Sequence, residues 1–443
     1  MYEDLKLDDL VIRSSSHTPF FGVYLAAHAI TDALCMCHAS VGCKVKTQQH
    51  LVGHDGGTDS HNRMRYSQFI DEDLIQGSTE QLESEISAFA RRLGSQLVLI
   101  DSSTPISLQA QPLGPVVERM RQKTGVDVLA VATRNYQDDL YAGVAATQAA
   151  IFRRQFERFE ANVQSDEVSV LGLPFDRFEG DCQGNVAELR RLLAGIGLRA
   201  PSVYLAGEPY AALSHTTQAR AHLVLPWAHA TARELQKVPG VTPDSVHKLG
   251  VPMGYAATAR WLGQVAQALQ IPQARVDAFR TAELQVAKPM AELARRRLRG
   301  HRYAAFAEAP RLAGLVLLLQ ELDMAPAVLA VTHFRPGGQR EVEAMLAEHG
   351  VTLPSDVQWL SDPTPQQVHA LAGDGDSRRP LDGVSLVIGT SIERELLAQS
   401  GVAFLEFGFP SEQRHFLQPA PWLGYRGALR LAEQVMQTIT WQR

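Results

Sequence analysis

The stretch at 33–43 reads ALCMCHASVGC and joins an apolar run to a glycine and a cysteine. The apolar run at 33–37 predicts a buried strand, and Gly42 with Cys43 predicts the start of a helix after it. Apolar segments typical of strands alternate with helical segments along almost the whole chain. This alternation is the pattern of parallel βαβ layers, so the sequence predicts an α/β fold.

The predicted strands fall into three parts of the chain. They lie at 33–37, 97–100 and 128–133, at 168–173, 202–206 and 222–226, and at 302–306, 327–332, 357–360, 386–388 and 403–407. The 443 residues are too many for a single core, so several domains are expected. We expect three doubly wound α/β domains with parallel sheets, at 1–165, 166–299 and 300–443, and a helix at the end of the third.

The composition excludes some classes of partner. The formal net charge is −6, and a mildly negative chain does not have the basic surface that nucleic-acid binding needs. The longest apolar run, at 312–319, is too short to cross a bilayer. The acidic start of the chain lacks the positive and apolar regions of a signal peptide. We therefore expect a cytoplasmic protein without a nucleic-acid or membrane partner.

Several cofactor and catalytic motifs are missing from the sequence. Neither the phosphate loop G-x-x-x-x-G-K-S/T nor a G-x-G-x-x-G after a strand occurs, so we do not expect this chain to hold a nucleotide. The G-x-S-x-G turn of serine hydrolases is missing as well. Doubly wound domains bind their ligands at the carboxyl ends of the strands, so we expect another kind of ligand there.

Three of the four cysteines, Cys35, Cys37 and Cys43, lie in the segment 16–57 together with five histidines. In the cytoplasm such a cluster fits metal ligation or thiols better than disulfides. A cysteine at a helix N-terminus has its thiolate stabilised by the helix dipole, which suits an iron–sulfur ligand. For Cys43, the role of an ordinary buried thiol is weighted equally with the role of an iron–sulfur ligand. Cys35 and Cys37 share one face of the predicted strand, and core packing is the favoured reading for both.

Two polar segments can add ligands. Asp101 begins the run DSST at 101–104, directly after the strand predicted at 97–100. A functional loop after a strand and a plain helix or turn cap are both compatible with this run. The run GHDGGTDSH at 53–61 mixes metal-binding side chains with glycines, and a flexible surface loop is its alternative reading.

Motifs at both ends of the chain resemble those of nitrogenase component 1 and its relatives. HTPFFG at 17–22 is similar to the C-Q-P-L-G-A-type segment of a β-type chain in that family, and HASVGC at 38–43 is similar to H-G-S-Q-G-C. VSLVIGTSIER at 384–394 resembles a strand and helix start of the family's last domain. GFP at 408–410 and GYRGA at 424–428 resemble two signatures near its end.

The resemblance implies three Rossmann-like domains and an oxidoreductase subunit. It implies an α2β2 heterotetramer with a homologous alpha-type subunit. A partner iron protein would hydrolyse ATP and deliver electrons, which agrees with the missing nucleotide motif in this chain. An iron–sulfur cluster would lie between the two kinds of subunit, held by cysteines from both.

The resemblance also assigns ligands. Cys43 matches a family cysteine directly, whereas the first cysteine position holds His17 and the third holds Asp101 and its neighbours. A 4Fe–4S cluster with uneven ligation, as in the related protochlorophyllide and chlorophyllide reductases, is then easier to build than a P-cluster-like one. We expect Cys43 as ligand, Asp101 and His17 as candidate non-cysteine ligands, and Cys37 and Cys35 ranked behind them. A β-type chain does not hold the family's catalytic cofactor, so we assign no catalytic residue.

The leading hypothesis is a β-like subunit of a nitrogenase-like, ATP-dependent reductase. It would pass low-potential electrons from the iron protein, through the shared cluster, to a small-molecule substrate. Dinitrogen, a tetrapyrrole and an organosulfur compound all stay open as substrates. A scaffold that assembles and transfers a metallocluster is the alternative. A third reading is a structural paralogue that stabilises a partner and binds no cluster.

Overall fold

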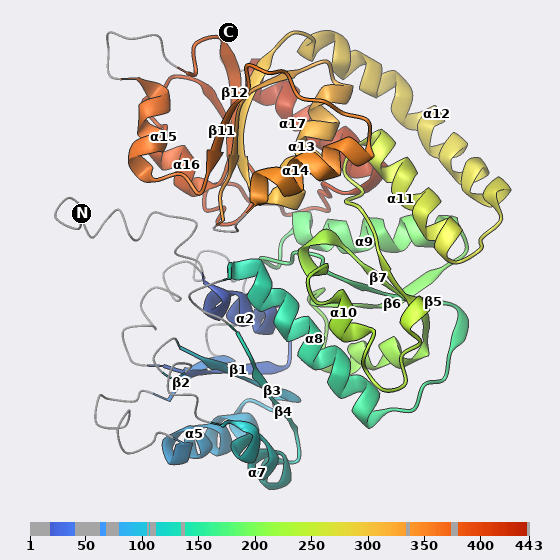
Figure 1. Ribbon diagram of the computed structural model, residues 1–443, viewed down its shortest axis with the longest axis vertical. Helices are drawn as coiled ribbons and strands as arrows, with labels where there is room; N and C mark the ends of the chain where they lie inside the picture. The colour runs from blue at the N-terminus through green and yellow to red at the C-terminus, as the bar shows by residue number, and fades with distance from the viewer. Residues whose placement is uncertain are drawn as a thin grey trace. The chain divides into compact units, whose positions relative to one another are not determined.

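The chain folds into an α/β protein whose described strands form three parallel β-sheets (Figure 1). The computed structural model describes residues 18–39, 63–67, 79–103, 106, 112–133, 138–333, 337–373 and 380–440. The described chain forms two compact units. One holds the chain up to Gln183 and again Gly197–Lys248, and the other holds Gly184–Ile196 and the chain from Leu249 onward.

The first sheet has the strand order β2-β1-β3-β4. Its strands are β2 (Met64–Tyr66), β1 (Ala33–His38), β3 (Leu97–Ser102) and β4 (Asp127–Val131). Every residue of β1 and β3 is buried, as expected for central strands of a parallel sheet that is covered on both faces.

Two pairs of helices cover this first sheet. On one face, α5 (Thr79–Arg92) and α7 (Gly114–Thr124) bury their apolar sides against Leu34 and Met36 of β1 and against β3. On the other face, α2 (Pro19–His28) packs against β1, β3 and α8 (Leu140–Arg158) (Figure 1). Successive side chains of a strand alternate between faces, so Cys35 and Cys37 lie on the α2 face.

The second sheet has the order β6-β5-β7-β8. Its strands are β6 (Arg199–Val203), β5 (Gln164–Leu171), β7 (Ala219–Val224) and β8 (Val246–Lys248). The short helices η3 (Tyr210–Gln218), η4 (Pro226–Ala228) and α10 (Ala232–Leu235) pack against α8.

The third sheet has the order β11-β10-β9-β12-β13, a doubly wound order that reverses between β9 and β12. Its strands are β11 (Gln358–Ser361), β10 (Ala325–Val331), β9 (Arg302–Ala307), β12 (Val384–Gly389) and β13 (Ala403–Glu406). One face packs against α15 (Pro365–Ala372) and α16 (Ser391–Leu396). The strands also contact α13 (Ala309–Glu321), α14 (Gly338–Glu348) and α17 (Gly424–Thr440).

Three further helices belong wholly or mainly to the unit that holds the third sheet. They are α11 (Tyr255–Ala268), α12 (Gln273–Leu298) and most of α9 (Gly180–Gly195). α12 packs against both α11 and α17. Across the described residues, no helix has the length and apolar character needed to span a membrane.

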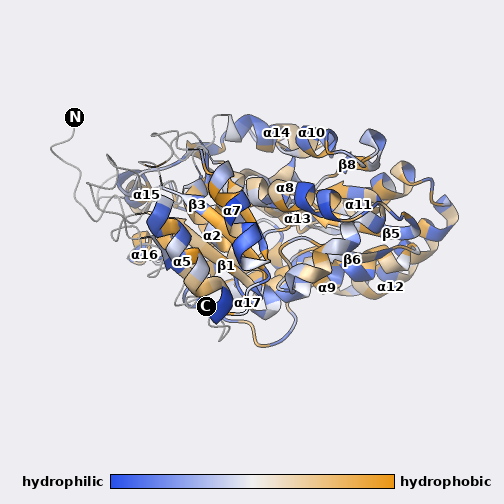
Figure 2. Cartoon of the chain, turned by 90° about the horizontal axis from the view of Figure 1, so that it is seen from below, coloured by the Kyte–Doolittle hydropathy of each residue, from blue (hydrophilic) through white to orange (hydrophobic). Residues whose placement is uncertain are grey.

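The predicted α/β class with parallel sheets is confirmed, while the three-domain division at 165 and 299 stays a prediction. The helix α2 was not predicted. All ten of its residues are buried, so it has no polar face and no amphipathic period that a sequence pattern can reveal. The apolar colouring around α2 and β1 reflects the same property (Figure 2).

Candidate functional site

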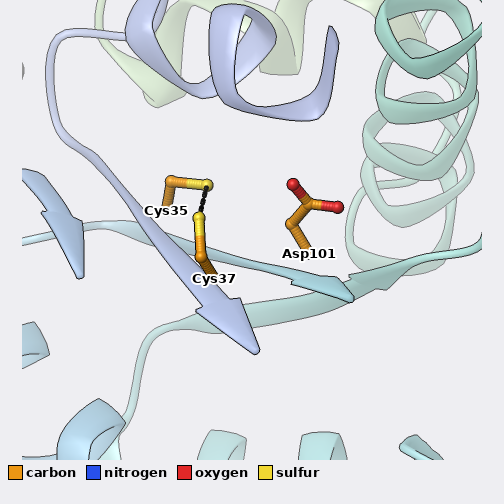
Figure 3. Close-up of side chains that lie close together, drawn as sticks. All are labelled: Cys35, Cys37 and Asp101. Carbon is orange, nitrogen blue, oxygen red and sulfur yellow. Dashed lines mark hydrogen bonds between the residues drawn. The ribbon is translucent and has the colours of Figure 1, made fainter. Parts of the chain in front are cut away.

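The candidate site lies on the α2 face of the first sheet, where β1 and β3 run side by side. The parallel register places Cys35 opposite Leu99 and Cys37 opposite Asp101. Partners in register on neighbouring parallel strands project from the same face, so Cys35, Cys37 and Asp101 share one face. Figure 3 shows the two cysteines side by side and the carboxylate of Asp101 next to them, all rising from the strands toward the helices above.

The three side chains are close enough to act on one ligand. The Sγ atoms of Cys35 and Cys37 are 3.8 Å apart, far longer than the roughly 2.05 Å of a disulfide bond. One ligand atom from each of the three residues lies within 4.8 Å of the other two. Among the described residues, no second group of three such side chains meets this geometry.

The whole group is buried. The exposed fractions are 1% for Cys35, 0% for Cys37 and 0% for Asp101. Burial of a carboxylate is costly unless a hydrogen bond, a charge or a metal compensates it, so core packing by itself does not select aspartate at this position. Thiolates and carboxylates are both metal ligands, and thiolates are the usual ligands of iron–sulfur clusters. The donor set therefore fits an iron–sulfur group.

His38, the last residue of β1, faces the opposite side of the sheet and is neutral. Its Nδ1 lies 2.8 Å from Oγ of Ser67, and burial lowers the pKa of His38 to about 4. The backbone around it is tied to both neighbouring strands. Ser67 donates its N–H to the carbonyl of Cys37, and Ser103 donates its N–H to the carbonyl of His38. These bonds hold the carboxyl end of β1, where the HASVGC motif begins.

The structure brings some of the predicted site residues together and does not describe others. Asp101 lies within β3 itself, which continues to Ser102 beyond the strand end predicted at 100. Cys35 and Cys37 lie beside it. The described residues do not include Cys43, His17 or the segment 53–61, so the roles assigned to them stay predictions. The ligand role of Cys35, Cys37 and Asp101 also stays a prediction.

The contact between Cys37 and Asp101 was not found from the sequence. The two residues belong to strands that are far apart in the chain, and their pairing depends on the register between those strands. The signal available in the sequence was the alternation of side chains along each buried strand. It places Cys35 and Cys37 on one face of β1, and it places Leu99 and Asp101 on one face of β3.

Comparison with known proteins gives a family and several relatives. The sequence profile described as "Nitrogenase component 1 type Oxidoreductase" matches residues 18–440. The nitrogenase molybdenum-iron protein beta chain of Clostridium pasteurianum is 25% identical over 151 residues, which cover 32% of this chain and 29% of that protein. A subunit of the light-independent protochlorophyllide reductase of Synechococcus elongatus is 24% identical over 384 residues, which cover 83% of this chain and 72% of that protein.

The fold also matches a solved structure. Nitrogenase Cp1 at pH 6.5 superposes with a TM-score of 0.79 and 18% sequence identity, over 99% of this chain and 94% of that chain. At this level of identity the superposition establishes a shared fold.

Proposed function

Because this chain belongs to the nitrogenase component 1 type oxidoreductases, we propose that it is the β-like subunit of a two-component, ATP-dependent reductase. In this role it receives low-potential electrons from a partner iron protein and delivers them toward a small-molecule substrate. A homologous alpha-type subunit completes an α2β2 heterotetramer, and the assembly works in the cytoplasm.

The name of one relative supports the β-like position, because that relative is a nitrogenase beta chain. The other relative is a subunit of a protochlorophyllide reductase. The two names point to different substrates, so the substrate of this chain stays open.

The observation that carries the proposal is the buried group of Cys35, Cys37 and Asp101. It lies on central strands of a parallel sheet, and Cys37 directly precedes the HASVGC motif in the sequence. A group of thiols and a carboxylate in this place supports a role in holding a metal–sulfur group, because both are good iron ligands.

The residues of this chain would contribute in distinct ways. When it is bound, a cluster of 4Fe–4S or P-cluster-like type, shared with the alpha-type subunit, supplies one-electron transfer at low potential. We assign Cys43 as the thiolate ligand from this chain, with Asp101 and His17 as non-cysteine ligands and Cys37 and Cys35 ranked behind them. Asp101 would offer an oxygen donor of the same charge where the family has a thiolate, and this change of donor would alter the reduction potential of a bound cluster. Burial of Cys37 and Asp101 keeps water away from this part of the sheet.

The test is iron and sulfide content with EPR of the complex, purified anaerobically with its partner subunit. We expect Cys43→Ala to lose most of the iron and the EPR signal of the wild type. Asp101→Cys should retain iron but change the EPR signal, because a thiolate replaces a carboxylate ligand. Cys182→Ala is the matched control, since Cys182 is buried in α9 and is not part of the group formed by Cys35, Cys37 and Asp101, and it should leave both measurements unchanged.

A Cys43→Ala complex with full iron content and an unchanged EPR signal would contradict the proposal. A turnover measurement separates it from the scaffold alternative. A reductase subunit supports ATP-dependent consumption of a substrate. Release of the cluster to an acceptor protein without any turnover would show that the chain is a scaffold and not a reductase subunit.

A further inference from the structure

The two cysteines of β1 have the spacing that a single metal ion requires. Two thiolates bound to one tetrahedral zinc ion, each about 2.3 Å from it, lie about 3.8 Å apart. The Sγ atoms of Cys35 and Cys37 are 3.8 Å apart. One ion of this kind can therefore be bound by both sulfur atoms without a change in their separation.

Asp101 supplies a third ligand atom. One of its carboxylate oxygens lies within 4.8 Å of both sulfur atoms, and Figure 3 shows the carboxylate on the same side of the sheet as the two thiols. A divalent ion at this point would compensate the charge of the buried carboxylate. Three protein ligands leave one position of a tetrahedral ion open, as in zinc sites that also bind water or a small molecule.

The strands hold these three ligands at a fixed spacing. β1 is hydrogen-bonded to β2 on one side and to β3 on the other, and both ladders include Cys35 and Cys37. Asp101 lies in β3, in register with Cys37. Ligands on paired strands lose little conformational freedom when an ion binds. All three belong to one compact unit of one chain, so the group is complete without a partner subunit.

Two sulfur atoms and one carboxylate oxygen select the class of cation. Mg²⁺ and Ca²⁺ prefer sites made of oxygen atoms, whereas thiolates favour zinc and similar thiophilic ions. On binding, the ion replaces the two thiol protons, which leave to solvent. Neither sulfur nor the metal changes its oxidation state in this step.

We propose that the chain without its partner subunit binds one thiophilic divalent cation of the zinc type at Cys35, Cys37 and Asp101. The site is mononuclear and needs neither the alpha-type subunit nor Cys43, so it does not rest on the proposed reductase role. Asp101 is also assigned to the shared cluster, and the ion therefore belongs to the chain before the subunits assemble.

The test is a titration of the isolated full-length chain with Co²⁺, after treatment with a chelator and without oxygen. We expect one Co²⁺ per chain, with a thiolate-to-cobalt charge-transfer band and the visible absorption of a tetrahedral ion. Zn²⁺ should displace Co²⁺ and remove both signals, whereas an excess of Mg²⁺ should leave them unchanged. Failure of Co²⁺ to bind, or a spectrum without the charge-transfer band, would overturn the proposal.

Variants of the three ligands locate the bound ion. Cys35→Ser and Cys37→Ser should each weaken Co²⁺ binding at least about tenfold, because each removes a thiolate. Asp101→Cys adds a third thiolate and should strengthen the charge-transfer band by about half, a gain that loss of folding cannot produce. Cys182→Ser is the matched control, a buried cysteine of α9 outside the group, and it should bind Co²⁺ like the wild type.

Cys43→Ala separates this site from the proposed cluster. As an isolated chain it should bind Co²⁺ like the wild type, although the assembled complex loses its cluster. If Cys43→Ala abolishes Co²⁺ binding while Cys35→Ser and Cys37→Ser retain it, the ion is bound by the proposed cluster ligand and the separate site is wrong. If the complex holds no cluster but the isolated chain binds Co²⁺ through Cys35 and Cys37, the site is supported and only the proposed function is wrong.

Discussion

At the residue scale, burial decides which protonation state a histidine can adopt. His222 of β7 is 2% exposed, with Nδ1 2.7 Å from Oγ of Ser169. The rings of Phe152 and Phe156 meet it edge-on, with centroids 4.8 and 5.8 Å from that of His222. Burial, with a smaller effect from the charge of His247, lowers the pKa of His222 to about 3. The imidazole is therefore neutral in the folded chain at all but strongly acidic pH.

This burial predicts a pH dependence of stability. In the unfolded chain the pKa of a histidine is about 6.5, so between that pH and about 3 the unfolded state binds more protons than the folded state. The free energy of unfolding then falls with decreasing pH, with His222 contributing about 1.4 kcal/mol per pH unit. We expect His222→Gln to make this slope shallower by about that amount between about pH 6 and pH 4, as measured by urea unfolding.

The control for this prediction is His369→Gln, because His369 is exposed near the end of α15. Its slope should equal that of the wild type. If the free energies of unfolding of His222→Gln and the wild type fall with the same slope against pH, the prediction is wrong, because His222 then takes up a proton in the folded state.

At the element scale, the position of α2 depends on two glycines. A Cβ on Gly22 of α2 would collide with the carbonyl oxygen of Leu140, and a Cβ on Gly143 of α8 would collide with the carbonyl oxygen of Pro19. The backbones of α2 and α8 touch at these points. Since α2 covers the face that carries Cys35, Cys37 and Asp101, this close contact also fixes the cover of the candidate site. The close contact between α2 and α8 also explains why the HTPFFG motif has a glycine at position 22.

We expect Gly22→Ala to lower the free energy of unfolding by about 2 kcal/mol, because the added methyl group forces α2 away from α8. Urea unfolding measures this change. Gly263→Ala is the matched control, a glycine within α11 whose Cβ would meet no atom within 4 Å. That change should stabilise the chain by about 0.5–1 kcal/mol, because alanine favours the helix. Equal stability of the two variants would contradict the close contact of α2 with α8.

At the scale of the whole molecule, the path of the chain makes both units discontinuous in sequence. The segment Gly184–Ile196, which contains most of α9, belongs with the chain from Leu249 onward. Oδ1 of Asn185 accepts the N–H groups of Trp422 and Leu423, at 2.9 and 3.0 Å. Arg191 joins Glu188 to Glu283 of α12. These bonds make α9 part of the packing of the C-terminal half of the chain.

A fragment that begins at Leu249 should therefore be incomplete. We expect it to unfold at a lower urea concentration than the same fragment with residues 180–197 fused through a flexible linker. The fused helix restores the acceptor for the two N–H groups and the charge partner of Glu283. A fused helix that carries Asn185→Ala and Arg191→Ala is the control and should restore less stability. Equal midpoints for the bare and the fused fragment would show that the chain from Leu249 folds without α9.

Much of the architecture follows from local patterns. The strand predicted at 33–37 is Ala33–His38, and the strand predicted at 97–100 is Leu97–Ser102. Both begin as continuous apolar runs, which a sequence pattern can identify. The helix α2 and the three-residue strands β2 and β8 were missed, because a fully buried helix has no polar face and a three-residue strand has too few residues for a pattern.

By itself the sequence determined the α/β class and the family, because alternating apolar segments and short motifs are properties of neighbouring residues. The tertiary structure decided that Cys37 stands opposite Asp101 and that Cys35 lies beside them. That register is set by hydrogen bonds between strands that are remote in the chain. It likewise decided that α9, α12 and α17 enclose one cavity, since three separate segments meet there through packing that no local pattern contains.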